Sequence, residues 1–151
     1  MHCKIPSLFF LTAVVLISCS QPRIDLLPDE DTIRETQQGT LIGGDNGKTH
    51  QWLGIPYGEI FSSEYRWKKA TAPQTWVGIR EVLTFGNFCV QKGSLVGTTE
   101  RQDWGKIIGS ENCLYLNIWA PRVTPEEIES GIANYPVMLW IRGGSNMAGN
   151  S

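Results

Sequence analysis

The sequence has few charges and few histidines. Only 19% of its 151 residues are Asp, Glu, Lys or Arg, the formal net charge is -2, and no basic run or acidic tail occurs. A chain without a basic patch lacks the electrostatic footprint of a nucleic-acid-binding protein, so we expect no nucleic acid partner. The only histidines are His2 and His50, and we expect no metal or cofactor. Six tryptophans exclude a disordered chain.

Long apolar runs are equally scarce, and the longest lies near the start. Ile5 to Ile17 is almost wholly apolar and follows Lys4. The run is shorter than the roughly 20 residues that span a bilayer, and it fits the apolar region of a secretory signal peptide. The alternative, a buried core helix, is disfavoured by Pro6 and by the absence of a polar face.

The apolar run ends in Leu16-Ile17-Ser18-Cys19, which resembles the lipobox of bacterial lipoproteins. We therefore expect residues 1–18 to be a lipoprotein signal peptide and Cys19 to carry acyl chains that anchor the exported protein to the membrane of the bacterial envelope. Ordinary cleavage nearby is the alternative and predicts a secreted protein. Residues 19–36 are polar and proline-containing, and they predict a solvated tether.

Two cysteines remain in the mature chain, Cys89 and Cys113. An even pair in an exported protein is a disulfide candidate. A zinc site is the poorer alternative, because two cysteines so far apart lack the close-spaced ligand pairs of zinc sites.

The pattern beyond residue 36 predicts strands and loops with little helix. Asp45-Asn46-Gly47 indicates a tight hairpin, because Asn and Gly tolerate positive φ. His50 follows this turn without a Ser or Asp partner, and we expect a surface strand residue. We expect strands at 40–42, 49–55, 79–88, 114–119 and 137–141, loops at 58–78 and 93–109, and one or two helical turns at 125–132. The continuous apolar run 137–141 predicts a strand buried on both faces, which needs parallel neighbours and covering helices. The chain therefore resembles an unfinished part of an α/β domain.

Four stretches, in order, resemble the type-B carboxylesterase family, which includes the cholinesterases and belongs to the α/β-hydrolases. The third, Ser110 to Asn117, reads S-E-N-C-L-Y-L-N, where the family typically has S-E-D-C-L-Y-L-N. The four stretches are residues 52–57, residues 65–67 with Trp76, residues 109–121 and residues 136–144. The resemblance implies that 37–151 is the N-terminal portion of such a domain: a small antiparallel sheet leading into the first strands of a large mixed sheet.

The resemblance also implies roles for single residues. Cys89 and Cys113 match the first disulfide of the family, and Arg66 and Glu111 match a structural ion pair. Trp104 lies close to the position of the tryptophan with which cholinesterases bind choline through a cation–π contact, although packing is the commoner use of such a ring.

The Gly143-Gly144-Ser145 turn matches the loop that supplies backbone N–H groups to the oxyanion hole. The nucleophile, acid and histidine follow this loop in the family, and no G-x-S-x-G occurs here, so we expect no catalytic residue in this chain. Two residues depart from the family pattern: Arg142 stands where His is usual, and Ser145 replaces the third glycine.

Three functions fit these observations. The leading hypothesis is the N-terminal part of a secreted or lipid-anchored serine carboxylesterase that acts on a small-molecule ester, inactive by itself. The second is a non-catalytic, cholinesterase-like binding or adhesion lipoprotein, which Arg142 and Ser145 favour slightly. The third, a structural lipoprotein domain complete as given, is disfavoured by the unfinished last strand.

Overall fold

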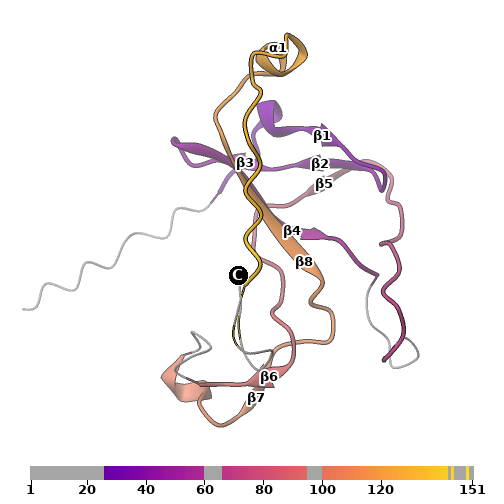
Figure 1. Cartoon of the computed structure of the whole chain (residues 1–151), viewed down its shortest axis with the longest axis vertical. Coiled ribbons are helices and arrows are strands. Elements are labelled where there is room, and N and C mark those ends of the chain that lie inside the picture. The colour runs from indigo at the N-terminus through magenta and orange to yellow at the C-terminus, as the bar shows by residue number, and fades with distance from the viewer. Residues whose placement is uncertain (1–25, 60–65, 95–99, 143, 145–148, 150–151) are drawn as a thin grey trace, which may run out of the picture.

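The computed structural model describes residues 26–59, 66–94, 100–142, 144 and 149. Two three-stranded sheets and a two-stranded ladder organise this part of the chain (Figure 1). The first sheet has the order β1-β2-β5 (Arg34–Glu35, Thr40–Ile42, Ile79–Glu81), the second has the order β3-β4-β8 (Gly44–Asp45, Thr49–Pro56, Tyr115–Pro121), and the ladder pairs β6 with β7 (Gln91–Lys92, Ile107–Ile108). The short helices are η1 (Glu30–Thr32), η4 (Arg101–Asp103) and α1 (Pro125–Glu129).

The predicted hairpin joins β3 to β4 as an antiparallel pair. Its turn is held by short side chains: Asp45 Oδ1 accepts from the Gly47 N–H at 2.6 Å, and Asn46 Oδ1 accepts from the N–H groups of Lys48 and Thr49 at 2.9 Å each. Gly47 has φ 84°, a conformation that a glycine adopts without strain. The Asp-Asn-Gly prediction is therefore confirmed.

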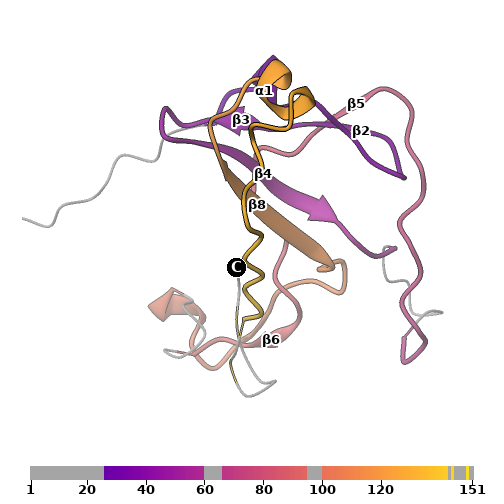
Figure 2. The ribbon, with the colours of Figure 1, turned by 45° about the horizontal axis from the view of Figure 1, so that its top comes forward.

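Strand β4 connects the two sheets, because it changes register around Gly54. Gly54 has φ 76°, its N–H donates to Asn117 Oδ1 on β8 at 2.9 Å, and a Cβ added there would lie 2.5 Å from the Thr84 carbonyl oxygen. On the other side, the Leu53 N–H donates to the Val82 carbonyl at 2.7 Å. The bulge lets one strand pair with β8 and also touch the segment after β5 (Figure 2).

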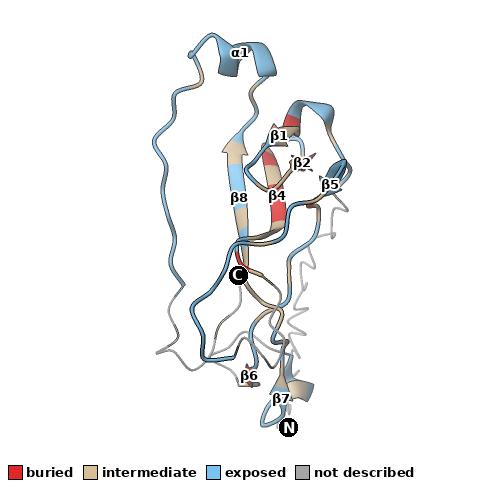
Figure 3. Cartoon of the chain, turned by 90° about the vertical axis from the view of Figure 1, so that its right-hand side faces the viewer, coloured by how far each residue is buried: buried red, intermediate tan, exposed pale blue. Residues whose placement is uncertain are grey.

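The core lies between the two sheets and is small. Its buried members are Leu41, Trp52 and Val82, and three partly buried side chains pack against them: Ile55, Trp76 and Ala120 (Figure 3). The Trp52 indole N–H donates to the Thr32 carbonyl at 2.8 Å, so its polar group is satisfied. Burying a side chain of this kind stabilises the fold by about 1.5–3 kcal/mol.

The predicted tether of 19–36 is wrong at its C-terminal end. Pro28 forms a bridge with Gly44, and Thr32 has no exposed surface. The Thr32 hydroxyl donates to the Asp29 carbonyl and accepts from the Gly43 N–H at 2.9 Å. Polar residues can be buried when their hydrogen bonds are made, so a polar composition did not keep this segment in solvent.

The prediction that His50 lies on the surface is also wrong, because its side chain is only 3% exposed. Alternation along β4 places His50 on the same buried face as Trp52, and their rings meet edge to face at 6.2 Å. Asp45 and Ala120 are its partners on the neighbouring strands. Among the residues that the structure describes, His50 Nδ1 has no hydrogen-bond partner.

The apolar run 137–141 does not form the expected buried strand. Its five residues are 80–96% exposed, and Figure 3 shows the segment running clear of the two sheets. None of the described strands pairs with it. A strand needs hydrogen-bonded neighbours, so the apolar pattern alone does not produce one here.

The remaining predictions of secondary structure are partly confirmed. The strand expected at 114–119 is β8, the strand at 40–42 is β2, and the helical turns at 125–132 include α1, which begins with a capping box between Thr124 and Glu127. The extended segment 79–88 is a strand only over β5. The loop 93–109 is more regular than expected, because it contains η4 and β7.

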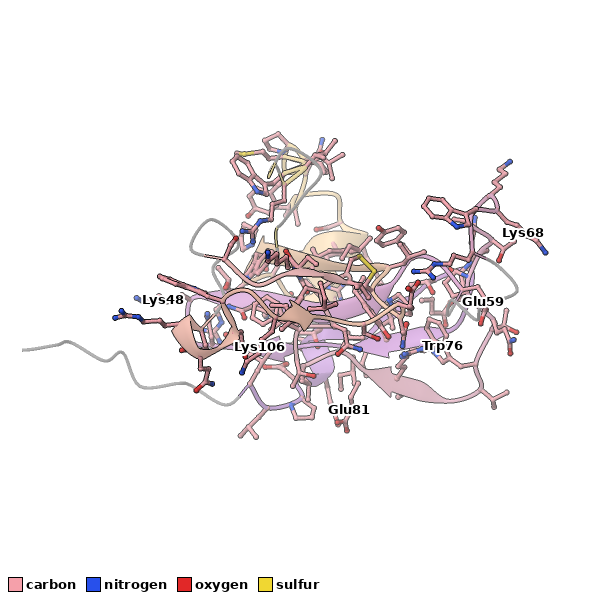
Figure 4. The ribbon with its side chains drawn as sticks, turned by 90° about the horizontal axis from the view of Figure 1, so that it is seen from below. Lys48, Glu59, Lys68, Trp76, Glu81 and Lys106 are labelled. Atoms are coloured by element: carbon pink, nitrogen blue, oxygen red, sulfur yellow. A yellow bond between two sulfur atoms is a disulfide. The ribbon has the colours of Figure 1, made fainter. Side chains whose placement is uncertain are left out.

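The loop before β5 is held by side chains. Figure 4 labels Trp76 and Glu59, which lie at its two ends. The Trp76 indole N–H donates to the Thr40 carbonyl at 2.9 Å, and Glu59 Oε2 accepts from the Gln74 N–H at 2.9 Å. The Arg80 guanidinium lies 5.1 Å from the Trp76 ring centroid.

Candidate functional site

A disulfide frames the candidate site. It joins Cys89 to Cys113, the two cysteines expected to pair, with their Cα atoms 4.9 Å apart, and it is a yellow bond in Figure 4. Inside the closed loop, Gln91 of β6 pairs with Ile108 of β7. A loop of this length contributes about 3–4 kcal/mol on the chain-entropy model.

The two ends of this loop approach closely at Gly109. This residue has φ 93°, and a Cβ added to it would lie 2.4 Å from the Cys89 carbonyl oxygen. The next N–H group, that of Ser110, donates to the Phe88 carbonyl at 2.9 Å. A side chain at position 109 would collide with the Cys89 carbonyl oxygen, so glycine is required where the two ends of the loop meet.

Arg66 and Glu111, the predicted ion pair, lie in contact. Arg66 Nη2 is 2.7 Å from Glu111 Oε1, and the two side chains are 58% and 47% exposed. A pair so open to solvent contributes about 0–1 kcal/mol. It joins the loop before β5 to a residue two positions before Cys113.

Trp104, the predicted substrate contact, ends η4 on the surface of the disulfide loop. Its side chain is 41% exposed, and the Arg101 guanidinium carbon lies 5.9 Å from the ring centroid. The Trp104 ring thus makes a cation–π contact with Arg101 of the same chain, and such a contact contributes about 0.5–1 kcal/mol at an exposed site. Its role toward a ligand stays a prediction.

The predicted oxyanion turn is described only in part. Gly143 and Ser145 lie outside the described residues, as does the lipidation candidate Cys19. Gly144 has φ 155° and Gly149 has φ 153°, backbone conformations that residues with a Cβ rarely adopt. We call residues 144–149 the glycine segment, after the glycines at its two ends. It follows the exposed run 137–141.

Gln91 holds the far end of this segment and was missed in the sequence. Its Oε1 accepts from the Gly149 N–H at 2.6 Å, and its Nε2 donates to the Gly149 carbonyl at 2.9 Å. The side chain is only 8% exposed. The signal that could have found it is its place two residues after Cys89, at the start of β6 inside the disulfide loop.

No group of three or more His, Cys, Asp and Glu side chains that could hold a metal ion occurs among the described residues. Within the same residues, no helix is both long enough and apolar enough to cross a bilayer.

Comparison with known proteins decides the family. The model of the carboxylesterase family matches residues 30–151. The chain belongs to the carboxylesterase family. This match extends from η1 through the glycine segment, and it includes the residues that were expected to form the end of the tether.

Curated carboxylesterase relatives come from bacteria and animals. The chain is 32% identical over 123 residues to the fumonisin B1 esterase of Sphingopyxis macrogoltabida, covering 81% of this chain and 20% of that protein. It is 33% identical over 110 residues to the para-nitrobenzyl esterase of Bacillus subtilis, with 73% and 20% covered. It is 36% identical over 131 residues to the acetylcholinesterase of Danio rerio, with 82% and 20% covered. The chain spans about a fifth of the length of these relatives.

Solved carboxylesterase structures share the fold. A PNB esterase matches with a TM-score of 0.52 at 31% identity, covering 60% of this chain and 18% of that structure. A thermophilic PNB esterase gives the same TM-score at 30% identity. The two sheets and the β6–β7 ladder are thus the N-terminal part of an α/β-hydrolase, as the sequence predicted.

Proposed function

We propose that this chain is the N-terminal part of a serine carboxylesterase that hydrolyses a small-molecule carboxylic ester through an acyl-enzyme. Family membership and relatives that are esterases support the proposal. The observation that carries it is the conformation of Gly144, since φ 155° is one that residues with a Cβ rarely adopt and it occurs at the position that matches the oxyanion loop of the family.

In the proposed reaction this chain stabilises charge, and the rest of the protein supplies the nucleophile. A serine oxygen adds to the ester carbonyl while a histidine accepts its proton, and the carbonyl oxygen becomes negative. The N–H groups of Gly144 and Ser145 would donate to that oxygen. The alkoxide leaves with the proton from the histidine, and water then hydrolyses the acyl-enzyme by the same steps. The nucleophile, acid and histidine are assigned to the protein outside residues 1–151.

The test uses the full-length protein with p-nitrophenyl acetate and a fluorophosphonate that labels activated serines. We expect saturable hydrolysis, and peptide mapping should place the label on a serine outside residues 1–151. Ser145→Ala is the matched control, because its oxyanion donor is a backbone N–H and labelling should persist. Label on Ser145 itself would show that the reactive serine is inside this chain and would overturn the assignment.

A non-catalytic binding or adhesion protein is the second candidate. Arg142 and Ser145 favour it, since the family usually has His and Gly at these two positions. A folded full-length protein that neither hydrolyses esters nor takes up the fluorophosphonate, yet retains affinity for a choline ester, would support this candidate over the esterase.

Export is proposed together with the esterase. The Cys89–Cys113 disulfide supports it, because disulfides persist in oxidising compartments outside the cytosol. We propose that Cys19 carries the lipid anchor and that the enzyme faces the periplasm or the cell surface.

A further inference from the structure

The turn between β3 and β4 contains the only Asn-Gly pair in the sequence, Asn46-Gly47. The backbone nitrogen after an asparagine can attack the side-chain amide carbon of that asparagine and close a small ring, in a reaction that needs no encounter between molecules. Glycine leaves this nitrogen open to the attack, because it carries no side chain. Gly47 is exposed, and a Cβ added there would meet no heavy atom within 4 Å. The nucleophile and the electrophile of an intramolecular reaction are therefore neighbours in an open turn.

Asp45 places a carboxylate at the attacking nitrogen. Its Oδ1 accepts from the Gly47 N–H at 2.6 Å, a short hydrogen bond of the charge-assisted kind. Its Oδ2 lies 2.6 Å from Arg122 Nε, so a guanidinium holds the second oxygen and offsets the negative charge. A carboxylate in hydrogen-bond contact with a proton that must be removed has the position of a general base.

Two backbone N–H groups lie at the oxygen that becomes negative during the attack. Asn46 Oδ1 accepts from the N–H groups of Lys48 and Thr49 at 2.9 Å each, and the Thr49 hydroxyl donates to the same oxygen at 3.4 Å. These donors polarise the amide carbonyl and stabilise the charge that forms on its oxygen, as the donors of an oxyanion hole do. Residues 45–49 thus hold a nucleophile, a base and charge-stabilising donors.

We propose that this turn is a modification site, at which the folded protein converts Asn46 and Gly47 to a cyclic imide. The Gly47 nitrogen forms a bond with Asn46 Cγ while its proton passes to Asp45, and the carbonyl electron pair moves onto Oδ1. When the tetrahedral intermediate collapses, the bond from Cγ to Nδ2 breaks. The proton held by Asp45 joins the leaving nitrogen, which departs as ammonia. Asp45 is thereby restored, and nothing is oxidised or reduced.

Water then opens the imide at either of its two carbonyl groups. Opening at one gives aspartate at position 46, and opening at the other gives isoaspartate, in which the main chain runs through the former side chain. Isoaspartate lengthens the backbone between β3 and β4 by one methylene, and both products add a negative charge beside Asp45. Direct hydrolysis of the side-chain amide gives aspartate only, so isoaspartate marks the imide route.

The first experiment compares the folded protein with an unfolded reference. The full-length protein and a synthetic peptide of residues 44–50, too short to keep a hairpin, are incubated in the same neutral buffer. Peptide mapping by mass spectrometry follows the imide and isoaspartate at position 46. We expect the folded protein to react at least about tenfold faster than the peptide, because a general base and oxyanion donors each contribute a factor larger than this. A folded protein that reacts at the rate of the peptide, or more slowly, would overturn the proposal.

Other asparagines are internal controls in the same digest. Asn87 and Asn134 are also exposed, but they precede Phe88 and Tyr135, whose side chains hinder the attack. Both should stay unmodified while Asn46 reacts. Aspartate without isoaspartate at position 46 would indicate direct hydrolysis and would also overturn the imide step.

The second experiment separates the base from the structural role of Asp45. Asp45→Asn keeps an oxygen that accepts from the Gly47 N–H but cannot take its proton, so imide formation at position 46 should slow at least about tenfold. Arg122→Gln is the matched control, because it removes the same ion pair and leaves the carboxylate, and its rate should stay within about threefold of the wild type. Equal slowing in the two variants would mean that the ion pair only holds the turn, and it would overturn the assignment of Asp45 as the base. Neither experiment depends on esterase activity.

Discussion

Arg122 Nε lies 2.6 Å from Asp45 Oδ2, which connects the end of β8 to the hairpin between β3 and β4. The other carboxylate oxygen of Asp45 accepts from the Gly47 N–H. The Asp45 side chain is only 11% exposed, whereas that of Arg122 is 58% exposed. One carboxylate thus holds both the hairpin turn and the strand that pairs with β4.

The two contacts of Asp45 can be separated by substitution. Asp45→Asn keeps an oxygen for the Gly47 N–H and loses the charge, so we expect the full-length protein to lose about 1 kcal/mol of unfolding free energy. Asp45→Ala loses both contacts and should lose about 2 kcal/mol. Urea denaturation measures both values, with Glu129→Gln on the exposed side of α1 as the control. Equal losses for Asn and Ala would contradict a separate contribution of the ion pair.

A substitution at Thr32 tests whether the segment before β1, which the sequence placed in a tether, belongs to the folded domain. Thr32→Val keeps the shape of the side chain but removes the partner of the buried Gly43 N–H, so we expect a loss of about 1–3 kcal/mol in urea denaturation. Thr71→Val makes the same change at an exposed position and should stay within about 0.5 kcal/mol of the wild type. A neutral Thr32→Val would show that the segment before β1 is not part of the folded domain in solution.

Ser145 tests the proposed oxyanion turn. Its side chain does not remove the backbone N–H but restricts the angles that aim it, so Ser145→Gly should raise kcat with KM nearly unchanged. The gain should be a part of the 10²–10³ range, about 3–4 kcal/mol, that a lost oxyanion donor typically costs. Steady-state kinetics on the full-length protein measure it. A fall in kcat would mean that Ser145 is already well placed and donates through its hydroxyl.

Cys19 tests the proposed lipid anchor. Cells that express the full-length protein with radioactive palmitate should label it and should retain it in the membrane fraction. Cys19→Ala should abolish the label and release the protein, because acyl chains hold an otherwise soluble domain at the membrane. Cys3→Ala is the matched control, since Cys3 lies in the predicted signal peptide, and it should label normally. Unlabelled, soluble wild-type protein would exclude the anchor.

Predictions from the sequence succeeded where a structural cause is local. The Asp45-Asn46-Gly47 turn closes through hydrogen bonds within four residues, so its sequence is sufficient to predict it. The helical turns expected at 125–132 are equally local, and the structure shows α1 there with its cap at Thr124. The disulfide and the Arg66–Glu111 pair are not local: the cysteine count made the disulfide a candidate, and resemblance to the carboxylesterase family implied both.

Predictions failed where partners distant in the sequence decide the outcome. His50 and Thr32 are polar, but β-sheet alternation and hydrogen bonds to the backbone bury them. Val137 to Ile141 is apolar, but no described strand pairs with it, so it stays exposed. Gln91 stands two residues after Cys89, but the sequence does not show that its side chain bonds a backbone group 58 residues away.

The disulfide also bears on the order in which the chain can fold. Strand β4 pairs with β8, whose residues follow it by about sixty positions, and the Cys89–Cys113 bond lies within that connection. Once this bond has formed, the chain that must be closed for β4 to meet β8 is shorter by the 24 positions that separate the cysteines. The entropy of loop closure changes slowly with length, so the gain is only about half a kcal/mol, yet it acts before any sheet contact exists. Early oxidation therefore speeds the encounter of the two strands, and a chain kept reduced reaches the same sheet by a longer search.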